Sequence, residues 1–579
     1  MMTVQRARLG FAALIAVLGL AFAAPASAEI VLHRGNNSEP DTLDPQKASG
    51  VWENNIIGDM FLGLMTEDTA AHVIPGAAES YAVSPDGLVY TFKLREGIVW
   101  SDGVPMTADD VVFSYRRIAD PNTAAQYAVN TYVIKNAQAV NENKMPKEQV
   151  GVRAIDERTV EITLEHPAPY FPQLLTHFAL FIVPKHVVET YGDDWVKPGT
   201  MVVNGAYSLA EWIPNEYVKA VKNARFYDAE NVKIDTVYYY PVSDAQAALK
   251  RFRSGEFDLN NNLPLQQVQW LRENMPAEVQ MSPTIWSNYV IFNTTRAPYD
   301  DLNVRNALGL AIDRELITGR ILAAGQVPAY ALVPIGMENY PGAAQVNYRD
   351  RPLEQRRAKA RELLAAAGYG PDNPLKFNFI FNSGVDNKRI AVALQDMWRQ
   401  IGVEITVQQI ETKVHYNTLR KQDFEVAWSG WVADFNDARN YLSLFESTTP
   451  DMNYGKYANA QYDALVRQSD TILDVAERAK IMAEAEQIML DEAAIAPVYF
   501  ATSRNLVHTY VKGWVENALD IHRTRFLSIE GREIAAADPA RGAGGSGAVA
   551  IEEKGWLENL WSWFLGLLCG WFGIACQTA

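Results

Sequence analysis

The sequence predicts an α/β protein with more than one lobe and a hinge between two of them. A chain of 579 residues is too long for a single hydrophobic core. Its second half alternates helical and strand-like patterns, which is typical of an open sheet. Two strand-like runs at 495–502 and 506–511 follow, and we expect them to return the chain to an earlier sheet. Lobes joined by more than one strand form a hinge that can close on a ligand.

Residues 1–28 have the pattern of a cleaved secretory signal. Two arginines precede an apolar run over 9–24, and Ala26-Ser27-Ala28 provides an A-x-A cleavage site. Residue 29 is Glu and not Cys, so we expect no lipid anchor there. The mature chain is therefore predicted to begin near Glu29 and to be periplasmic. An uncleaved anchor helix is the alternative.

The composition is that of a globular protein, with 48% hydrophobic and 21% charged residues. The net charge is −17 without a basic stripe, which disfavours nucleic acid and anionic membranes as partners of the main body. The two cysteines, Cys569 and Cys576, lie near the C-terminus, so the body has no disulfide framework.

Motifs of enzymes and cofactor sites are missing from the sequence. There is no phosphate-binding loop, no zinc protease motif, no G-x-S-x-G and no cluster among the eight histidines. The run 542–547 fits the dinucleotide-binding pattern but follows no strand, so we reject it. The prediction is a protein that is no enzyme and has no cofactor or metal.

The first half is predicted to contain short strands and capped helices. Thr107 is expected to cap a helix through Ile118, with Asp110 in the capping-box position. Gly255 is expected to end a helix that begins at Asp244. The other expected elements are strands at 30–33, 88–95, 151–165, 201–221 with a turn at Asn204-Gly205, and 234–242, a helix at 56–65, and a turn at 260–262.

The second half is predicted to form an open, substantially parallel sheet covered by helices. The expected helices are 303–322, 354–367, 386–401 and 474–493, and the expected strands are 377–381, 403–410 and 424–428.

Asp434 is the candidate functional residue. It follows the predicted strand 424–428 and a loop beginning at Ser429-Gly430, and it lies among Trp428, Trp431 and Phe435. A carboxylate between indole rings costs free energy unless a cation meets it, and a ligand ammonium would do so. Cation–π attraction would add roughly 0.5–2 kcal/mol. The alternative is that Asp434 caps a helix that starts at residue 435 or 436.

Several separated motifs resemble the large solute-binding proteins of ABC importers that carry peptides and nickel (family 5). The motifs lie at 85–97, 100–103 and 107–114. Further stretches at 203–207, 253–258, 304–314 and 431–436 are similar to the members that bind oligopeptides and murein peptides. The resemblance extends from about residue 32 to residue 529.

The resemblance implies a clamp of two lobes with an extra inserted domain, three lobes in all. Lobe I would comprise 29–51, 185–285 and 502–532, lobe II 52–184, and lobe III 286–501. Lobes I and III would close on the ligand. Residues 533–555 would be a flexible linker, and 556–579 an apolar, tryptophan-rich tail.

The resemblance also implies oligopeptide binding by a monomeric body that passes its ligand to an ABC permease. Asp434 matches the position that binds the peptide's ammonium, and Tyr127 matches its tyrosine partner. The peptide would lie extended against Gly430, Val432 and the loop near Glu39. The expected pocket walls include Trp431, Asn261, His177 and Trp428.

Four positions depart from the oligopeptide-binding pattern. Trp428 and Leu419 stand at positions of arginines, and Asn387 stands at the position of a histidine. The replaced arginines and histidine can bind a peptide carboxylate. Thr412 stands at the position of a pocket tryptophan. We therefore expect longer, modified or C-terminally blocked peptides, or a ligand with an apolar far end. Arg420 or Lys388 could supply the cation from a neighbouring position.

Other interpretations stay open. The same clamp could bind a nickel chelate, haem or an oligosaccharide, or the scaffold could serve as a hydrolase or an envelope chaperone. The tail could contact the membrane and tether the protein, or be an extension without function. Cys569 and Cys576 could pair between chains.

Overall fold

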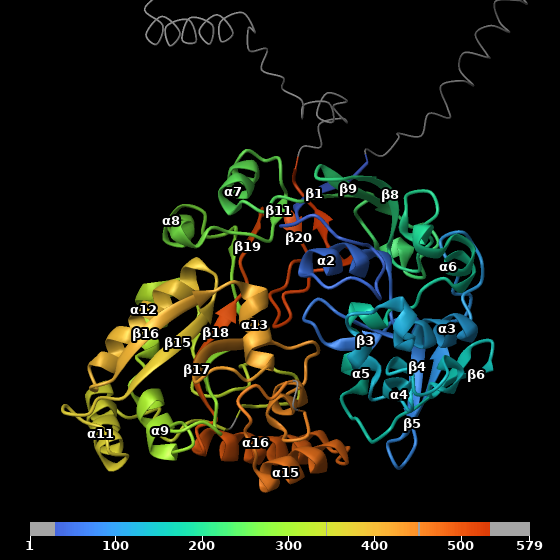
Figure 1. Cartoon of the computed structure of the whole chain (residues 1–579). Coiled ribbons are helices and arrows are strands. Elements are labelled where there is room, and N and C mark those ends of the chain that lie inside the picture. Colours follow the sequence, from blue (N-terminus) through green and yellow to red (C-terminus); the bar gives the residue numbers. More distant parts are fainter. Residues whose placement is uncertain (1–28, 343, 450–451, 533–579) are drawn as a thin grey trace, which may run out of the picture. The chain divides into compact units, whose positions relative to one another are not determined.

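Three large β-sheets organise the body of the chain (Figure 1). The computed structural model describes residues 29–532, apart from 343 and 450–451. Residues Ile30–Gly531 form one compact unit. Within the described residues, no helix is both long and apolar enough to cross a membrane. The predictions for the signal, the linker, the tail and the two cysteines lie outside the described residues.

The first sheet has seven strands in the order β12-β19-β11-β1-β10-β9-β8. The central β1 runs parallel to β10 and β11, and the other neighbours are antiparallel. Leu32 of β1 lies opposite Val237 of β10, and both are fully buried. The strands are β1 (Val31–Gly35), β8 (Tyr207–Ile213), β9 (Tyr217–Lys222), β10 (Thr236–Tyr240), β11 (Leu259–Asn260), β12 (Val279–Gln280) and β19 (Asn505–Val507).

Helices α7 (Ala245–Arg253) and α8 (Val268–Asn274) follow strands of this sheet. The predicted start of α7 is confirmed, because Asp244 Oδ1 accepts a hydrogen bond from Ala247 N at 2.7 Å. Gly255 follows with a positive φ of 74°, which a glycine adopts at little cost.

Two predicted turns of this region are wrong. The β8–β9 hairpin turns at Asn215, whose φ is 62°, and not at Asn204-Gly205. Asn204 instead uses its side chain to accept a hydrogen bond from Leu62 N at 2.9 Å. Asn260 belongs to β11 and is 1% exposed, because its strand lies in the interior of the sheet.

A second sheet of four antiparallel strands has the order β4-β5-β7-β6. The capping box of α3 (Ala108–Ala119) is confirmed, since Asp110 Oδ2 accepts from Thr107 N at 2.9 Å. The predicted helix 56–65 is α2 (Val51–Met60), which ends earlier because Phe61 takes an extended conformation. The strands are β4 (Ala78–Val83), β5 (Val89–Leu94), β6 (Val152–Asp156) and β7 (Thr159–Thr163), with a separate pair, β2 (Met65–Glu67) and β3 (Val73–Pro75).

The third sheet has six strands in the order β14-β18-β13-β17-β15-β16. Only β15 with β16 and β15 with β17 are parallel; the other neighbours are antiparallel. The prediction of a substantially parallel sheet is therefore wrong for three of its five strand pairs, because β13 and β18 enter from outside the βα alternation. The strands are β13 (Pro283–Phe292), β14 (Val327–Pro328), β15 (Lys376–Asn382), β16 (Glu404–Ile410), β17 (Val426–Val432) and β18 (Ile495–Thr502).

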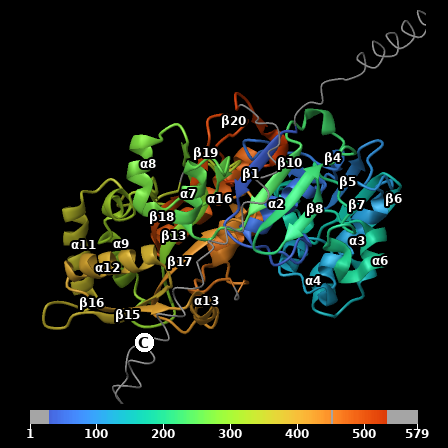
Figure 2. The ribbon, with the colours of Figure 1, turned by 90° about the horizontal axis from the view of Figure 1, so that it is seen from above.

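The helices of this region accompany the third sheet. Figure 2 shows α12 beside β15 and β16. The predicted helix 303–322 is divided, because Asp313 leaves the helical conformation and its Oδ1 accepts from Leu316 N at 2.9 Å. The helices are α9 (Leu302–Leu310), α10 (Arg314–Leu316), a π-helical turn (Ile317–Leu322), α11 (Leu353–Ala366), α12 (Val385–Arg399), α13 (Thr412–Arg420), α15 (Ala460–Asp470) and α16 (Val475–Asp491).

The chain crosses twice between the seven-stranded and six-stranded sheets. It passes from β12 to β13 through Met281 and Ser282, and from β18 to β19 through Ser503 and Arg504. The two crossings are bonded to each other: Ser503 N donates to Ser282 O at 2.8 Å, and Ser282 N donates to Ser503 Oγ at 2.9 Å. The predicted return of the chain to an earlier sheet is confirmed for β19, which joins the seven-stranded sheet, and is wrong for β18, which stays in the six-stranded sheet. The hinge stays a prediction.

The predicted lobe boundaries assign almost all strands of one sheet to one lobe. The exceptions are β13, which begins at Pro283, whereas lobe III is expected from residue 286, and β18, which ends at Thr502, one residue beyond the expected end of lobe III. The boundaries themselves stay a prediction.

Candidate binding site

Strand β17 (Val426–Val432) forms the backbone of the candidate site. We expected it to end at Trp428, with a loop from Ser429, and this is wrong. Residues 429–432 remain in the strand because they pair with Tyr289–Trp286 of β13, with Gly430 opposite Asn288.

One edge of β17 is paired with a neighbouring strand over only part of its length. Strand β15 pairs with it at Val426 and Ala427 alone. The carbonyl oxygen of Trp428 accepts from His415 Nε2 at 2.9 Å. Beyond it, no strand among the described residues pairs with this edge of β17. A free strand edge can bind an extended peptide through backbone hydrogen bonds.

A cleft of about 480 Å³ lies against this strand. One wall holds Trp428 and Gly430 from β17 together with Trp286 and Asn288 from β13, and the opposite wall comes from 244–246 and 262–266. A Cβ atom at Gly430 would lie 3.0 Å from Asn288 Oδ1, so any side chain there would narrow the cleft. The structure thus places two of the predicted residues, Trp428 and Gly430, in the cleft wall.

Asp434 follows β17 by two residues and has a partly buried carboxylate. Burial raises its pKa to about 6, and a hydrogen bond from Asn440 opposes this shift. None of the ion pairs within residues 29–532 involves Asp434. Its alternative role as a helix cap is wrong, because the next helix, α14 (Arg439–Leu442), begins five residues later with Ala438 at its N-cap.

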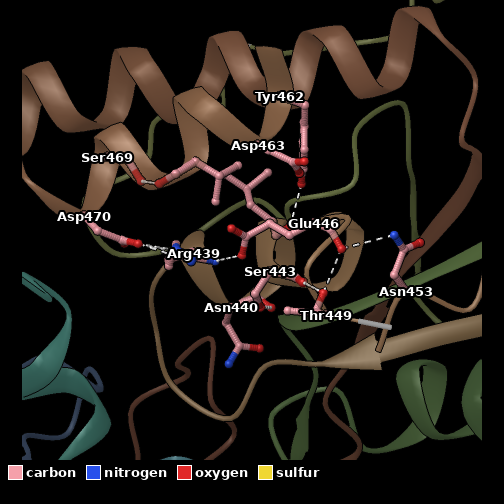
Figure 3. A network of polar contacts seen from close by, with 12 residues as sticks. Arg439, Asn440, Ser443, Glu446, Thr449, Asn453, Tyr462, Asp463, Ser469 and Asp470 are labelled. Atoms are coloured by element: carbon pink, nitrogen blue, oxygen red, sulfur yellow. Dashed lines mark hydrogen bonds and ion pairs between the residues drawn. The ribbon is translucent and has the colours of Figure 1, made fainter. Parts of the chain in front are cut away.

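A buried polar network holds the loop that carries Asp434. Arg478 donates to Asp437 through both terminal nitrogens, at 2.6 and 2.9 Å. Figure 3 shows Arg439 between two acids, Asp470 at 3.0 Å and Glu446 at 2.8 Å. These ion pairs link the loop and α14 to α15 and α16, while Asp434 takes part in no ion pair among the described residues.

Asn440 connects this network to the site. Trp431 Nε1 donates to Asn440 Oδ1 at 2.6 Å, while Asn440 also hydrogen-bonds Asp434. The indole of Trp431 and the carboxylate of Asp434 are thereby held beside each other, as the sequence predicted.

Tyr127 lies close enough to Asp434 for the carboxylate charge to affect the pKa of the tyrosine. Burial raises the pKa of Tyr127 to about 12, and the carboxylates of Asp434 and Glu53 add to this shift. The ring of His177 lies 4.6 Å from the Tyr127 ring, and burial lowers the pKa of His177 to about 3, so this histidine is neutral. His177 thus lies against Tyr127, and Tyr127 lies within electrostatic range of Asp434.

Phe435 explains how distant parts of the chain meet at these residues. Its ring stacks on Tyr170, with centroids 5.1 Å apart, and it joins the hydrophobic core built mainly from residues 32–239. Since Phe435 is anchored there, the neighbouring Asp434 faces the segment of Tyr127.

Three further predicted residues lie outside the cleft lining. Glu39 accepts hydrogen bonds from Trp212 Nε1 at 2.8 Å and Asn215 N at 3.1 Å. Asn261 donates to Asn505 Oδ1 at 2.8 Å, and its neighbour Asn262 lines the cleft instead. Val432 is 53% exposed beside Trp286. Their roles in binding stay predictions.

The positions that depart from the family pattern are spread over the site. Asn387 lines the cleft, whereas Leu419 is buried in the core and Thr412 hydrogen-bonds Ser383 at 3.0 Å. Neither Lys388 nor Arg420, the two substitute cations suggested by the sequence, lines the cleft. The cleft cation is Arg504, which sequence reasoning missed because it lies in the crossing between two strands.

The described residues contain no group of three or more His, Cys, Asp or Glu side chains that could hold a metal ion.

Comparison with protein families gives a match over residues 72–453 to the bacterial extracellular solute-binding proteins, family 5. The chain belongs to this family. This family 5 protein is 37% identical over 492 residues to the periplasmic oligopeptide-binding protein OppA of Salmonella typhimurium, covering 83% of this chain and 89% of OppA. It is 36% identical over 493 residues to the probable deoxycholate-binding periplasmic protein YgiS of Escherichia coli, covering 85% and 91%.

Among solved structures, this family 5 protein is similar to the unliganded open form of the periplasmic murein tripeptide-binding protein MppA. The TM-score is 0.78 at 34% identity, and the match covers 87% of this chain and 99% of MppA. These likenesses confirm the predicted family and the multi-lobed clamp.

Proposed function

We propose that this family 5 protein captures oligopeptides by their N-terminal ammonium in the periplasm and delivers them to an ABC permease. The observation that carries the proposal is the unpaired carboxylate of Asp434, held beside Trp431 and Tyr127 at the end of a free strand edge. An ammonium would offset the cost of burying this charge.

The arrangement suits a peptide better than a solute without a main chain. The edge of β17 beyond Trp428 offers backbone groups to any peptide, whatever its side chains. The periplasmic OppA and MppA relatives support this ligand class and this compartment. Catalysis is not part of the proposal, because family members are solute-binding proteins.

The relative named for deoxycholate defines the most informative rival, since a bile acid has a carboxylate and no amine. Amine dependence separates the two ligand classes. A peptide held by Asp434 must lose affinity when its amine is acetylated or when the Asp434 carboxylate is removed. A bile acid has no amine for Asp434 to bind, so its affinity should not fall when this carboxylate is removed.

The test is calorimetric titration of one peptide, its N-acetylated form and deoxycholate into the parent protein and Asp434→Asn. We expect acetylation and the substitution each to weaken peptide binding at least tenfold, with no further loss when both are present. Affinity for the free-amine peptide should also fall about tenfold per pH unit below pH 6, where Asp434 is protonated, and Asp434→Asn should show no such dependence.

Equal binding of free and acetylated peptides would overturn the proposal, as would tight binding of deoxycholate alone. Asp350→Asn is a suitable control, because this carboxylate is exposed and outside the cleft.

A further inference from the structure

Arg504 is the only cation among the cleft-lining residues that the structure describes. The cleft also contains two acids, but Asp244 caps α7 and Asp386 lies 3.6 Å from Arg389. None of the ion pairs in the described part of the chain involves Arg504. A partly buried guanidinium facing a cleft without a carboxylate partner is a site for an anionic group.

The backbone around Arg504 fixes the direction of its side chain. Ser503 is bonded to Ser282 of the other crossing, and Asn505 is buried, where it donates to Asp520 Oδ1 at 2.7 Å. Side chains alternate in extended backbone, so the residue between these two faces the cleft.

The surroundings favour an ion pair with a ligand. The rings of Trp428 and Tyr499 stack with centroids 6.0 Å apart and form an aromatic wall beside Arg504. Apolar walls lower the local dielectric constant, which strengthens the attraction between opposite charges. An unoccupied donor lies in the same cleft: Asn288 is 3% exposed, and its Nδ2 has no hydrogen-bond partner among the described residues.

We infer that Arg504 binds the C-terminal carboxylate of the captured peptide and that Asn288 donates a hydrogen bond to a peptide oxygen beside it. This inference rests on the proposed function and deepens it. It assigns this clamp to peptides with two free ends, whereas the replaced arginines and histidine had suggested blocked or apolar far ends.

The separation of the two charges limits the length of such a peptide. Trp428, in the wall beside Arg504, precedes Asp434 by six residues, which corresponds to at most about 20 Å of extended chain. A peptide that spans this distance in an extended conformation has no more than about six residues. The C-terminal carboxylate of the peptide should therefore contribute fully to the affinity only in peptides of one preferred length.

The experiment compares free-acid and C-terminally amidated peptides of two to eight residues, all with free amines. They are titrated into the full chain and into Arg504→Gln and Arg504→Lys. We expect amidation to weaken binding about 10- to 100-fold at the preferred length. Arg504→Gln should weaken acid binding by the same factor and leave amide binding unchanged, and Arg504→Lys should recover part of the affinity.

Two matched variants test whether any nearby cation would serve. Lys388→Gln and Arg420→Gln remove the same charge outside the cleft and should leave the acid–amide difference intact. Thermal unfolding of each variant checks that the fold is retained, since Arg504 has no ion pair in the described chain to lose.

The outcomes separate this inference from the proposed function. Free-amine peptides that bind equally as acids and amides, with affinity indifferent to Arg504→Gln, would overturn the inference while the role of Asp434 stands. Loss of the acid–amide difference in Lys388→Gln or Arg420→Gln would also overturn it. Peptides that fail to bind in any form would overturn both.

Discussion

The buried carboxylate of Asp434 lowers the free energy of unfolding of the ligand-free protein but provides a charge that can bind a ligand. Its carboxylate is partly buried with one amide as a hydrogen-bond partner, and its pKa is raised from 3.8 to about 6. A raised carboxyl pKa means that the folded state holds the proton more tightly than the unfolded chain does. The stability associated with this proton is full below the unfolded pKa and is lost as the pH rises through 6. Functional sites commonly accept such a cost.

We therefore expect Asp434→Asn to stabilise the ligand-free protein at pH 7. The gain should be about 1–3 kcal/mol, because the substitution removes a charge that burial disfavours by about two pKa units. The gain should shrink towards zero near pH 4, where the wild-type carboxyl is protonated. Urea unfolding at both pH values measures it.

Asp350→Asn serves as the exposed control and should change the free energy of unfolding by no more than about 0.5 kcal/mol. A destabilised Asp434→Asn protein at pH 7 would contradict the prediction and would indicate that a partner within the protein already satisfies the carboxylate.

At the scale of elements, the loop between β17 and α14 is held in place by buried ion pairs. The side chains of Arg439, Asp470 and Glu446 are 11%, 8% and 6% exposed, so they lie almost entirely away from water (Figure 3). Removal of one member of such a group leaves charges that neither water nor protein compensates. The network is therefore costly to break, and it fixes the loop that presents Asp434.

Arg439→Met should lower the free energy of unfolding by about 3–5 kcal/mol, because it leaves two buried carboxylates unpaired. The matched control is Arg399→Met, which removes an arginine whose partner Asp396 is exposed, and it should cost no more than about 1 kcal/mol. Urea denaturation compares them. Equal effects of the two substitutions would show that the network contributes little.

At the scale of the whole molecule, the cleft combines residues from two sheets that are joined by the paired crossings at Ser282 and Ser503. Ligand contacts on both walls would couple the two lobes. Binding also stabilises the folded state by mass action, by about 2.7 kcal/mol at a ligand concentration one hundred times Kd.

Hydrogen exchange should report this coupling. We expect a bound peptide to slow amide exchange in β17 at 429–432 and in the opposite wall at 244–246 and 262–266 at the same time. The strands of the four-stranded sheet line no part of this cleft and provide the internal reference. Protection confined to one wall would contradict a ligand held by both lobes.

Local patterns in the sequence were sufficient for much of the fold. The capping box at Thr107, the start of α7 at Asp244 and its end before Gly255 depend on neighbouring residues, so the sequence predicted them correctly. The extent of β17 and the direction of β13 and β18 depend on pairing between distant segments, and these predictions failed. A strand end is set by its partner as much as by its own residues.

The candidate site divides in the same way. The family, the choice of Asp434 and its aromatic neighbours follow from residue type and order, so they could be predicted without coordinates. Three features emerge only from the folded chain: Asp434 lies within electrostatic range of Tyr127, Glu39 and Asn261 hydrogen-bond other residues, and Arg504 lines the cleft. These facts depend on where Phe435 packs and where the crossing strands run, and such long-range contacts leave no local pattern in the chain.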